Sequence, residues 1–384
     1  MYNTTILTIL FLFIITHAIG QNFGKTVTAI KKYQTVTILK SADSTQQVAI
    51  CAHLQARVMT STLNGSEGNS LGWVNLKHIA SRTLTPHINL WGGEERIWFG
   101  PEGGQYALYF KKGDKFEYKY WQVPSAIDTE PFTLIKATNS KAHFIKDIKL
   151  KNYTGYEFSF RAERLINLIT ESELKRILPN ISNNIRWVGY ESRNIVRNTG
   201  SKAWSQDKGL ISIWIMGMYP AHNQVVAIFP TTMPKPTPNI DYFQPLDTTR
   251  LKLRDSTLFF KTDGKYRSKI GLDYTSSKNV IGSYDAKYKL LTVIIYNLPA
   301  KPMPYVKSTW KYHEKPYEGD VTNSYNDGEA PMYELETSSP ALQLKAGESY
   351  LHIQKTLHFQ GSIQELDAIC KKLLGVSIHT IPFK

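Results

Sequence analysis

The chain has 384 residues, a formal net charge of +14 and two cysteines. This length allows one large domain or two ordinary domains, each with a sizeable core. Two cysteines exclude a zinc site built from several thiolates. The positive charge could favour acidic glycans or anionic surfaces, but lysine and arginine occur in runs no longer than two. We therefore expect a solvated basic surface and no nucleic-acid partner.

The N-terminal segment resembles an export signal. Residues 1–20 contain no Lys, Arg, Asp or Glu, and the apolar run from Ile6 to Ile15 is interrupted only by Thr8. Ala18-Ile19-Gly20 has the small-x-small spacing of a cleavage site. This pattern predicts a signal peptide over residues 1–20 and a periplasmic or secreted mature protein. An uncleaved anchor is the alternative, but the run is short for a membrane span, so we expect no stable span after cleavage.

Alternating apolar and polar residues predict strands through most of the remaining chain. Aromatic and β-branched side chains enrich these stretches, and Gly, Pro, Asn and Asp cluster between them. The predicted strands cover residues 27–39, 47–59, 105–110, 156–161, 210–216, 225–230, 290–296, 332–337 and 349–359.

Two segments carry helix signals. Thr170 and Glu173 have the spacing of a capping box, and the helix that they begin must end before Pro179. Ser362 and Glu365 repeat this spacing at the start of a C-terminal helix over residues 362–374, with Gly375 beyond its end.

The order of these elements predicts the fold class. Strands and helices do not alternate, which favours an all-β fold, a large antiparallel β-sandwich with two short helices. We expect residues 21–384 to form a single domain. Residues 230–245 contain five prolines and are either a linker or a long surface loop.

A glycine-rich segment, residues 85–105, combines acidic, basic and aromatic side chains. Glycine permits tight turns and close backbone approach, and indole rings stack on flat apolar surfaces. This mixture suits a polyhydroxylated ligand such as a sugar. The candidate substrate-binding residues here are Asn89, Trp91, Glu95, Arg96, Trp98 and Glu102.

A second candidate site lies on the predicted strand 332–337. Glu334 and Glu336 project from the same face of a strand, because side chains alternate with period two. Mutual repulsion can raise the proton affinity of one carboxylate, which would suit a general acid or base near neutral pH. The alternative is a solvated polar face of an edge strand.

The long strand 349–359 places polar side chains, His352 among them, on one face. These residues could line a cleft beside the two glutamates if the two strands pair as a hairpin. His352 is therefore a candidate ligand contact, although a histidine in such a strand can equally be a structural hydrogen-bonding residue.

The C-terminal residues Glu334, Glu336, Pro340, Leu344 and Gly347-Glu348 resemble the closing motif of galactose mutarotase-like proteins. In that motif a glutamate-bearing strand precedes a turn and a long strand. The resemblance is strongest to a secreted bacterial family of uncharacterised function within this group. It spans roughly residues 70–360 and includes residues 92–96, 100–105, 191–200 and 209–214.

The resemblance implies a β-supersandwich with a ligand cleft on one concave sheet. In mutarotases a glutamate takes the proton of the anomeric hydroxyl and a histidine protonates the ring oxygen. The implied base is Glu336, with Glu334 second, and the acid is His87 or His222. Arg96 would hold a hydroxyl or carboxylate of the sugar. No cofactor is implied, because the reaction only moves protons.

Alternatives of other classes remain open. The same cleft could bind glycans without catalysis, or two carboxylates could cleave a glycosidic bond. Residues 320–329 are rich in oxygen ligands but lack the standard calcium-loop spacing, so they favour a turn, and we expect no metal. Cys51 and Cys370 could form a disulfide in an exported protein or remain buried thiols.

Overall fold

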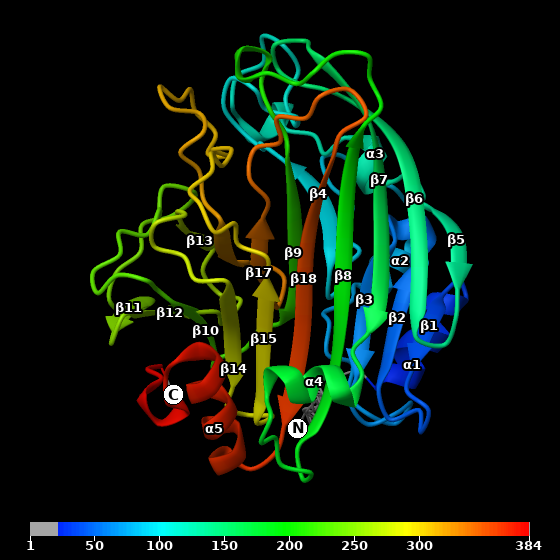
Figure 1. Ribbon diagram of the computed structural model, residues 1–384, viewed down its shortest axis with the longest axis vertical. Coiled ribbons are helices and arrows are strands. Elements are labelled where there is room, and N and C mark those ends of the chain that lie inside the picture. The colour runs from blue at the N-terminus through cyan, green and yellow to red at the C-terminus, as the bar shows by residue number, and fades with distance from the viewer. Residues whose placement is uncertain (1–21, 384) are drawn as a thin grey trace, which may run out of the picture.

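The computed structural model describes residues 22–383, which form a layered β-sandwich with short helices around it (Figure 1). Every strand pair in the described sheets is antiparallel. The largest sheet has ten strands, in the spatial order β11 (Leu251–Arg254), β12 (Thr257–Lys261), β10 (Val225–Pro230), β14 (Val280–Asp285), β15 (Leu290–Tyr296), β18 (Ser349–Gln360), β8 (Arg186–Asn198), β7 (Glu157–Leu168), β6 (Lys141–Lys151) and β5 (Thr133–Ala137).

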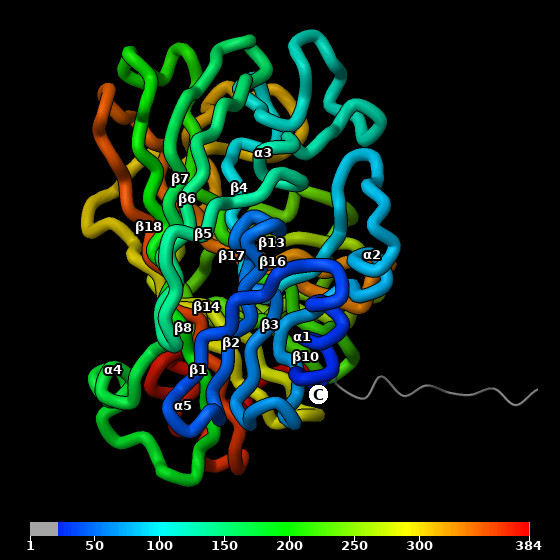
Figure 2. Tube along the Cα trace, turned by 90° about the vertical axis from the view of Figure 1, so that its right-hand side faces the viewer, coloured from blue at the N-terminus to red at the C-terminus, as the bar shows by residue number. Residues whose placement is uncertain are grey.

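Two smaller sheets accompany it. The second sheet has five strands, in the order β13 (Ser268–Leu272), β16 (Thr322–Asn326), β17 (Met332–Ser338), β9 (Ser212–Pro220) and β4 (Arg96–Gly100). The third has three strands, β1 (Thr37–Lys40), β2 (Gln47–Cys51) and β3 (Arg57–Thr62). In the side view of Figure 2, β6, β7, β8 and β18 form one layer, and β4 and β17 lie beside it in a second. The predicted all-β sandwich is confirmed.

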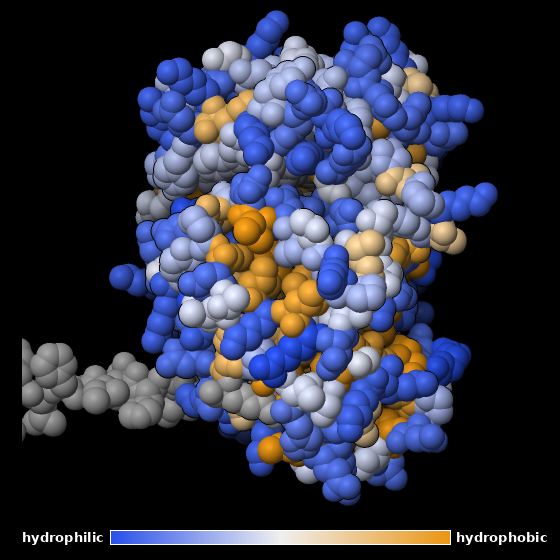
Figure 3. Space-filling view, turned by 90° about the vertical axis from the view of Figure 1, so that its left-hand side faces the viewer, coloured by the Kyte–Doolittle hydropathy of each residue, from blue (hydrophilic) through white to orange (hydrophobic). Residues whose placement is uncertain are grey.

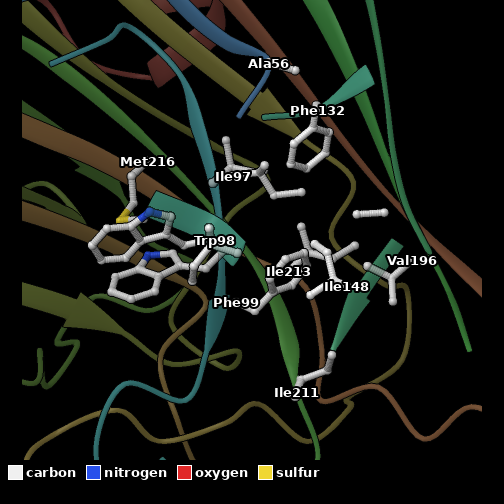
Figure 4. Packing of buried hydrophobic residues seen from close by; sticks show 14 of the residues in the cluster. Ala56, Ile97, Trp98, Phe99, Phe132, Ile148, Val196, Ile211, Ile213 and Met216 are labelled. Carbon is white, nitrogen blue, oxygen red and sulfur yellow. The ribbon is translucent and has the colours of Figure 1, made fainter. Parts of the chain in front are cut away.

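The main core fills the space between the ten-stranded and five-stranded sheets. Strand alternation sends Ile97 and Phe99 of β4 into this core, whereas Trp98 and Met216 lie on the other side of the five-stranded sheet (Figure 4). Ile148 and Val196 come from the facing large sheet. Each strand of the small sheet therefore has one face in the core and a second face that is free to form a site.

Five α-helices lie within the described residues: α1 (Phe23–Lys31), α2 (Leu76–Ser81), α3 (Ser125–Asp128), α4 (Glu171–Ile177) and α5 (Ile363–Leu374). The two predicted helices are α4 and α5, and both capping boxes are formed. Gly375 ends α5 in a left-handed conformation, with a φ of 70°. The apolar side of α5 packs against the large sheet.

Three strand predictions need correction. Residues 23–31 form α1 because the Asn22 side chain caps the amide of Lys25 and places Phe23, Val27 and Ile30 on one buried face, so the strand begins only at Thr37. The predicted strand 47–59 is divided into β2 and β3 by a 3-10 turn, Ala52–Leu54. Residues 105–110 form turns and bends, although Tyr109 and Phe110 are buried in the core.

Further sequence expectations concern the proline-rich segment, the two cysteines and the signal peptide. Residues 230–245 form a long loop between β10 and β11 of one sheet. Cys51 and Cys370 are both buried free thiols. The predicted signal peptide, residues 1–20, lies outside the described residues. None of the helices between residues 22 and 383 is long and apolar enough to cross a bilayer.

The surface on the left of Figure 1 carries a group of hydrophobic side chains among mainly hydrophilic ones (Figure 3). The strands β11, β12 and β13 lie on this side. Exposed apolar residues of the described chain include Leu253 of β11 and Phe243 of the loop before it. Phe243 also belongs to the rim of a large cavity.

Candidate functional site

A cavity of about 690 Å³ lies over the outward face of the five-stranded sheet. Its floor is made by even-numbered residues of three adjacent strands, namely Trp98 of β4, Met216 and Met218 of β9, and Met332 and Glu334 of β17. Loops close its sides, including residues 242–244, 265–267 and 309–310. The early tryptophan-rich segment and the late acidic strand therefore meet in one hollow.

Four tryptophans line this cavity. Trp98 and Trp214 meet edge to face with ring centroids 5.8 Å apart, and Trp121 stacks on Trp310 at the same separation. Tyr118 extends this wall towards solvent by stacking on Trp121. Sequence reasoning did not place Trp121, Trp214 or Trp310 in the site. They lie far apart in the chain, and no spacing rule connects them.

Arg96 and Glu334 form an ion pair on the cavity floor. Arg96 Nη2 lies 2.8 Å from Glu334 Oε1, and both side chains are almost fully buried. The guanidinium carbon also lies 4.2 Å from the centre of the Trp98 ring, a cation–π contact that holds the group flat against the wall. Arg96 Nε and Nη1 have no hydrogen-bond partner within residues 22–383. These two donors are therefore both buried and unpartnered.

Burial raises the pKa of Glu334 to about 7. The positive charge of Arg96 opposes this rise, the negative charge of Glu336 adds to it, and Lys269 opposes it. Loss of water around the carboxylate outweighs the favourable ion pair. A carboxyl group that exchanges its proton near neutral pH can serve as a general acid or base.

Glu336 lies behind the cavity wall. It is fully buried, and its Oε2 accepts hydrogen bonds from Lys269 Nζ at 2.8 Å and from Trp214 Nε1 at 2.9 Å. Lys269 and Trp214 both line the cavity, whereas Glu336 does not. Glu334 and Glu336 do share one face of β17, as the alternation predicts, but only Glu334 is open to the cavity.

Glu102 supplies a second carboxyl group to the cavity. Although its surface is only half-buried, the loss of surrounding water raises its pKa. The positive charge of Lys269 lowers this pKa, and the negative charge of Glu336 raises it. Glu102 and Glu334 are therefore two proton-binding groups in one aromatic cavity.

The other predicted residues of the segment 85–105 lie away from the cavity. Asn89 donates to Asp128 Oδ2 at 2.7 Å, and Trp91 Nε1 donates to the Asp128 carbonyl at 3.3 Å. Glu95 is fully buried between the sheets, 2.7 Å from Arg164 Nη2 and 3.0 Å from Gln354 Nε2. Adjacent residues of a strand face opposite ways, so Glu95 points into the core while Arg96 points into the cavity.

The candidate histidines are also separate from the cavity lining. His87 Nδ1 lies 2.5 Å from the Trp121 carbonyl oxygen, and its ring packs on Tyr118, so it stands behind the rim. His222 lines a different cavity and bonds Asp285. His352 is fully buried, which lowers its pKa to about 3. None of the described residues that line the 690 Å³ cavity is a histidine.

The expected hairpin of β17 with β18 is wrong. The strand β17 pairs with β9 and β16, and β18 pairs with β8 and β15 of the other sheet. The polar face of β18 points between the sheets, where His352 Nε2 lies 2.9 Å from Thr337 Oγ1 and His358 Nε2 lies 2.9 Å from Glu94 Oε1. These side chains are buried opposite the core face of β17, not beside its glutamates.

No group of His, Cys, Asp or Glu with the arrangement of a metal site occurs among residues 22–383. Within the segment 320–329, Asp327 Oδ1 accepts hydrogen bonds from the amides of Glu329 and Ala330. Asp320 accepts from Asn239 Nδ2 at 2.8 Å. These carboxylates stabilise a turn and a loop.

Residues 21–383 match the protein family described as Family of unknown function (DUF6786). The chain belongs to this family. No curated protein matches the chain.

Solved structures similar to the chain include galactose mutarotase-like proteins. One is an Escherichia coli K12 protein provisionally named an aldose 1-epimerase, with 10% sequence identity, a TM-score of 0.50, and coverage of 85% of this chain and 99% of that one. Another is a galactose mutarotase related enzyme from Lactobacillus acidophilus, with 12% identity, a TM-score of 0.48, and coverage of 85% and 98%. At 10% identity the similarity to the Escherichia coli protein shows the fold alone, a galactose mutarotase-like β-sandwich.

Proposed function

We propose that the protein binds a sugar in the 690 Å³ cavity and catalyses proton transfer at its anomeric centre, as an aldose epimerase does. The Arg96–Glu334 ion pair, set in a wall of four tryptophans beside Glu102, carries this proposal. The galactose mutarotase-like fold supports the same class of ligand. The predicted signal peptide would place the reaction in the periplasm or outside the cell.

The cavity chemistry fits a carbohydrate. Indole rings offer flat apolar surfaces that stack against the C–H faces of a pyranose. The unpartnered Nε and Nη1 of Arg96 can donate hydrogen bonds to ring hydroxyls. A buried donor without a partner costs desolvation free energy. A hydrogen bond to a sugar hydroxyl would recover that cost.

The reaction requires a base for the anomeric hydroxyl and an acid for the ring oxygen. We assign the base to Glu334, whose pKa of about 7 leaves a substantial carboxylate population at neutral pH. Glu102, with its raised pKa, supplies the proton. The carbon–oxygen ring bond then breaks to give the open-chain aldehyde, and the reverse transfers close the ring with either configuration. Opening and closing the ring requires only proton transfers, so no cofactor takes part.

This assignment differs from the resemblance-based expectation in two respects. Lys269 and Trp214 stand between Glu336 and the cavity, so Glu336 acts by holding Lys269 and not as the base. A second carboxyl replaces the expected histidine. Two carboxyl groups at one site also fit glycosidic-bond cleavage, which the same experiments distinguish by its products.

Glycan binding without catalysis is the second candidate. The ion pair at 2.8 Å favours it, because a carboxylate held by an arginine is a poorer base than a free one. In that case the aromatic wall would bind sugar, and the carboxyl groups would only orient its hydroxyls.

Polarimetry on freshly dissolved aldoses tests the catalytic proposal. We expect the wild-type protein to accelerate the return to anomeric equilibrium and Glu334→Gln to slow it at least about tenfold, equivalent to about 1.4 kcal/mol of barrier. Glu171→Gln, on the exposed face of α4, is the matched control and should keep full activity. Wild-type rates equal to those in buffer would exclude mutarotation. Calorimetric titration with oligosaccharides then tests binding, and the release of reducing ends tests cleavage.

A further inference from the structure

A second cavity, of about 480 Å³, lies at one end of the sandwich. The five-stranded sheet contributes Tyr219 and Tyr333 to its lining, and the ten-stranded sheet contributes Ser283, Leu290 and Thr292. The segment that follows β3, residues 63–74, closes its third side. Both sheets and one connecting segment therefore form the wall of a space that core side chains leave unfilled.

This cavity is distinct from the sugar cavity because the two lie on opposite faces of the same strands. Along β9, Met216 and Met218 face the sugar cavity, whereas Tyr219 faces the second one. Along β17, Glu334 faces the first cavity and Tyr333 the second. Period-two alternation thus makes two separate chambers from one pair of strands.

The closing segment is held firmly in place. A side chain at Gly72 would come within 2.6 Å of the Met59 carbonyl oxygen and 2.8 Å of Glu94 Cβ, so its backbone lies directly against its neighbours. The amide of Leu71 donates to the Ser61 carbonyl at 3.0 Å. These contacts fix this wall of the cavity, which reduces the ordering cost of binding.

The wall of the second cavity is mainly apolar. Its apolar side chains include Leu63, Leu71, Trp73, Val74, Tyr219, Leu290 and Tyr333. Two of the polar groups in this wall are already bonded: Ser283 Oγ lies 2.7 Å from the Tyr333 hydroxyl, and Thr292 Oγ1 lies 2.9 Å from His358 Nδ1. A ligand with many hydroxyls would find few partners here, whereas an apolar ligand leaves these bonds intact.

The charges around the cavity compensate one another. The lining contains two basic residues, Arg186 and Lys287, and two acidic residues, Glu67 and Asp285. Asp285 is further satisfied by His222 Nε2 at 2.8 Å and by the amide of Tyr288 at 3.1 Å. The lining thus carries no excess of either sign that would select an ion.

We infer that this cavity is a second ligand site, which binds a small uncharged apolar molecule built on up to three rings. Its volume lies within the usual range for small-molecule pockets. The occupant would touch both sheets at once, so binding also stabilises the sandwich by mass action. This inference does not depend on the proposed sugar chemistry.

Fluorescence titration with N-phenylnaphthylamine, an uncharged two-ring dye with an additional phenyl group, tests the inference on the whole protein. We expect saturable binding to one site, at least about fivefold tighter than binding of its sulfonated analogue anilinonaphthalene sulfonate. Leu290→Trp and Ala221→Phe each fill the cavity from a different wall and should weaken dye binding at least about tenfold. Having two variants keeps the test usable if one of them does not fold, as judged by cooperative thermal unfolding.

Two controls locate the dye. Leu134→Trp adds an aromatic ring on the exposed edge strand β5 and should bind the dye as the wild type does. Trp310→Ala opens the sugar cavity and should also leave dye affinity unchanged. The inference is overturned if the wild type shows no saturable binding, if the sulfonated dye binds as tightly, or if only Trp310→Ala abolishes binding. Sugar binding by Leu290→Trp, measured separately, reports on the first cavity alone.

Discussion

Arg96 of β4 and Glu334 of β17 meet across the intervening strand β9, with Nη2 and Oε1 2.8 Å apart. The pair is buried on the cavity floor, so each charge depends on the other for compensation. Two segments more than two hundred residues apart in the sequence thereby form one charged centre on the cavity floor. Its stability and the pKa of its carboxyl group can be tested directly.

Removing the arginine should destabilise the fold in a pH-dependent way. Arg96→Met leaves Glu334 buried without its cation, and loss of one partner of a buried pair costs about 3–5 kcal/mol. Protonation of Glu334 relieves part of this cost, so the loss should be larger at pH 8 than at pH 5. Urea denaturation at both pH values measures it. The double variant Arg96→Met/Glu334→Leu should recover much of the stability at pH 8; a double variant as unstable as Arg96→Met would contradict this account.

Glu334 should also give the wild type a measurable pH dependence of stability. Its pKa rises from an ordinary 4.5 to about 7 in the folded protein, so the folded state keeps a proton that the unfolded chain has lost. The contribution is fully present below about pH 4.5 and is lost as the pH rises through about 7. It amounts to at most about 3 kcal/mol. Comparing wild type with Glu334→Gln cancels other titrating groups, and identical slopes for the two proteins would disprove the effect.

The proposed reaction should depend on the same proton. If Glu334 is the base, the rate of mutarotation rises with pH as its carboxylate forms, with a midpoint near 7. Arg96→Met should shift this midpoint to higher pH, because it removes the nearby positive charge. Glu336→Gln should shift the midpoint less. Initial rates by polarimetry between pH 5 and pH 9 provide the profile. A midpoint unchanged in Arg96→Met would assign the base to another group.

Tyr118 should distinguish long sugars from short ones. Its ring is 54% exposed at the rim and stacks on Trp121, with centroids 6.0 Å apart. Tyr118→Ala should weaken binding of a disaccharide or trisaccharide by about 1 kcal/mol, which is about fivefold, and leave monosaccharide affinity nearly unchanged. Calorimetric titration with a chain-length series measures both. Tyr33→Ala, at an exposed tyrosine outside the cavity lining, is the matched control.

The buried pair Arg164–Glu95 should matter for stability and not for sugar binding. Both side chains are fully buried between the sheets, 2.7 Å apart. Arg164→Met should cost about 3–5 kcal/mol in the free energy of unfolding, while the folded protein keeps its sugar affinity. Arg161→Met, which breaks an exposed pair with Asp147, should cost less than about 1 kcal/mol. Equal losses in the two variants would contradict the role assigned to burial.

Local patterns predicted the parts of the fold that local interactions decide. The capping boxes at Thr170 and Ser362 identified α4 and α5 because side chain and backbone satisfy each other within one turn. Period two placed Glu334 and Glu336 on one face of β17. Residues 27–31 are predicted as a strand because β-branched side chains are frequent there, but Val27 and Ile30 are three residues apart and share one face of a helix.

The rest of the site depends on contacts that no local rule encodes. Trp310 and Lys269 reach the cavity from a loop and a strand far from Arg96 in sequence. The strand order places β17 and β18 in different sheets. The connection between them in the sequence did not reveal this separation. Glu95 and Arg96 look equally suited to a ligand in the sequence, but strand orientation assigns one to the core and one to the cavity.

Because side chains alternate along β9, this one strand contributes to the walls of both cavities. Inserting a single residue between Met216 and Tyr219 would rotate every later side chain of that strand to the opposite side. An insertion directly after Met216 would move Met218 out of the floor of the sugar cavity and Tyr219 out of the wall of the second cavity in the same event. Evolution can therefore alter either chamber by substitution, but a change of length in this strand must be tolerated by both or by neither.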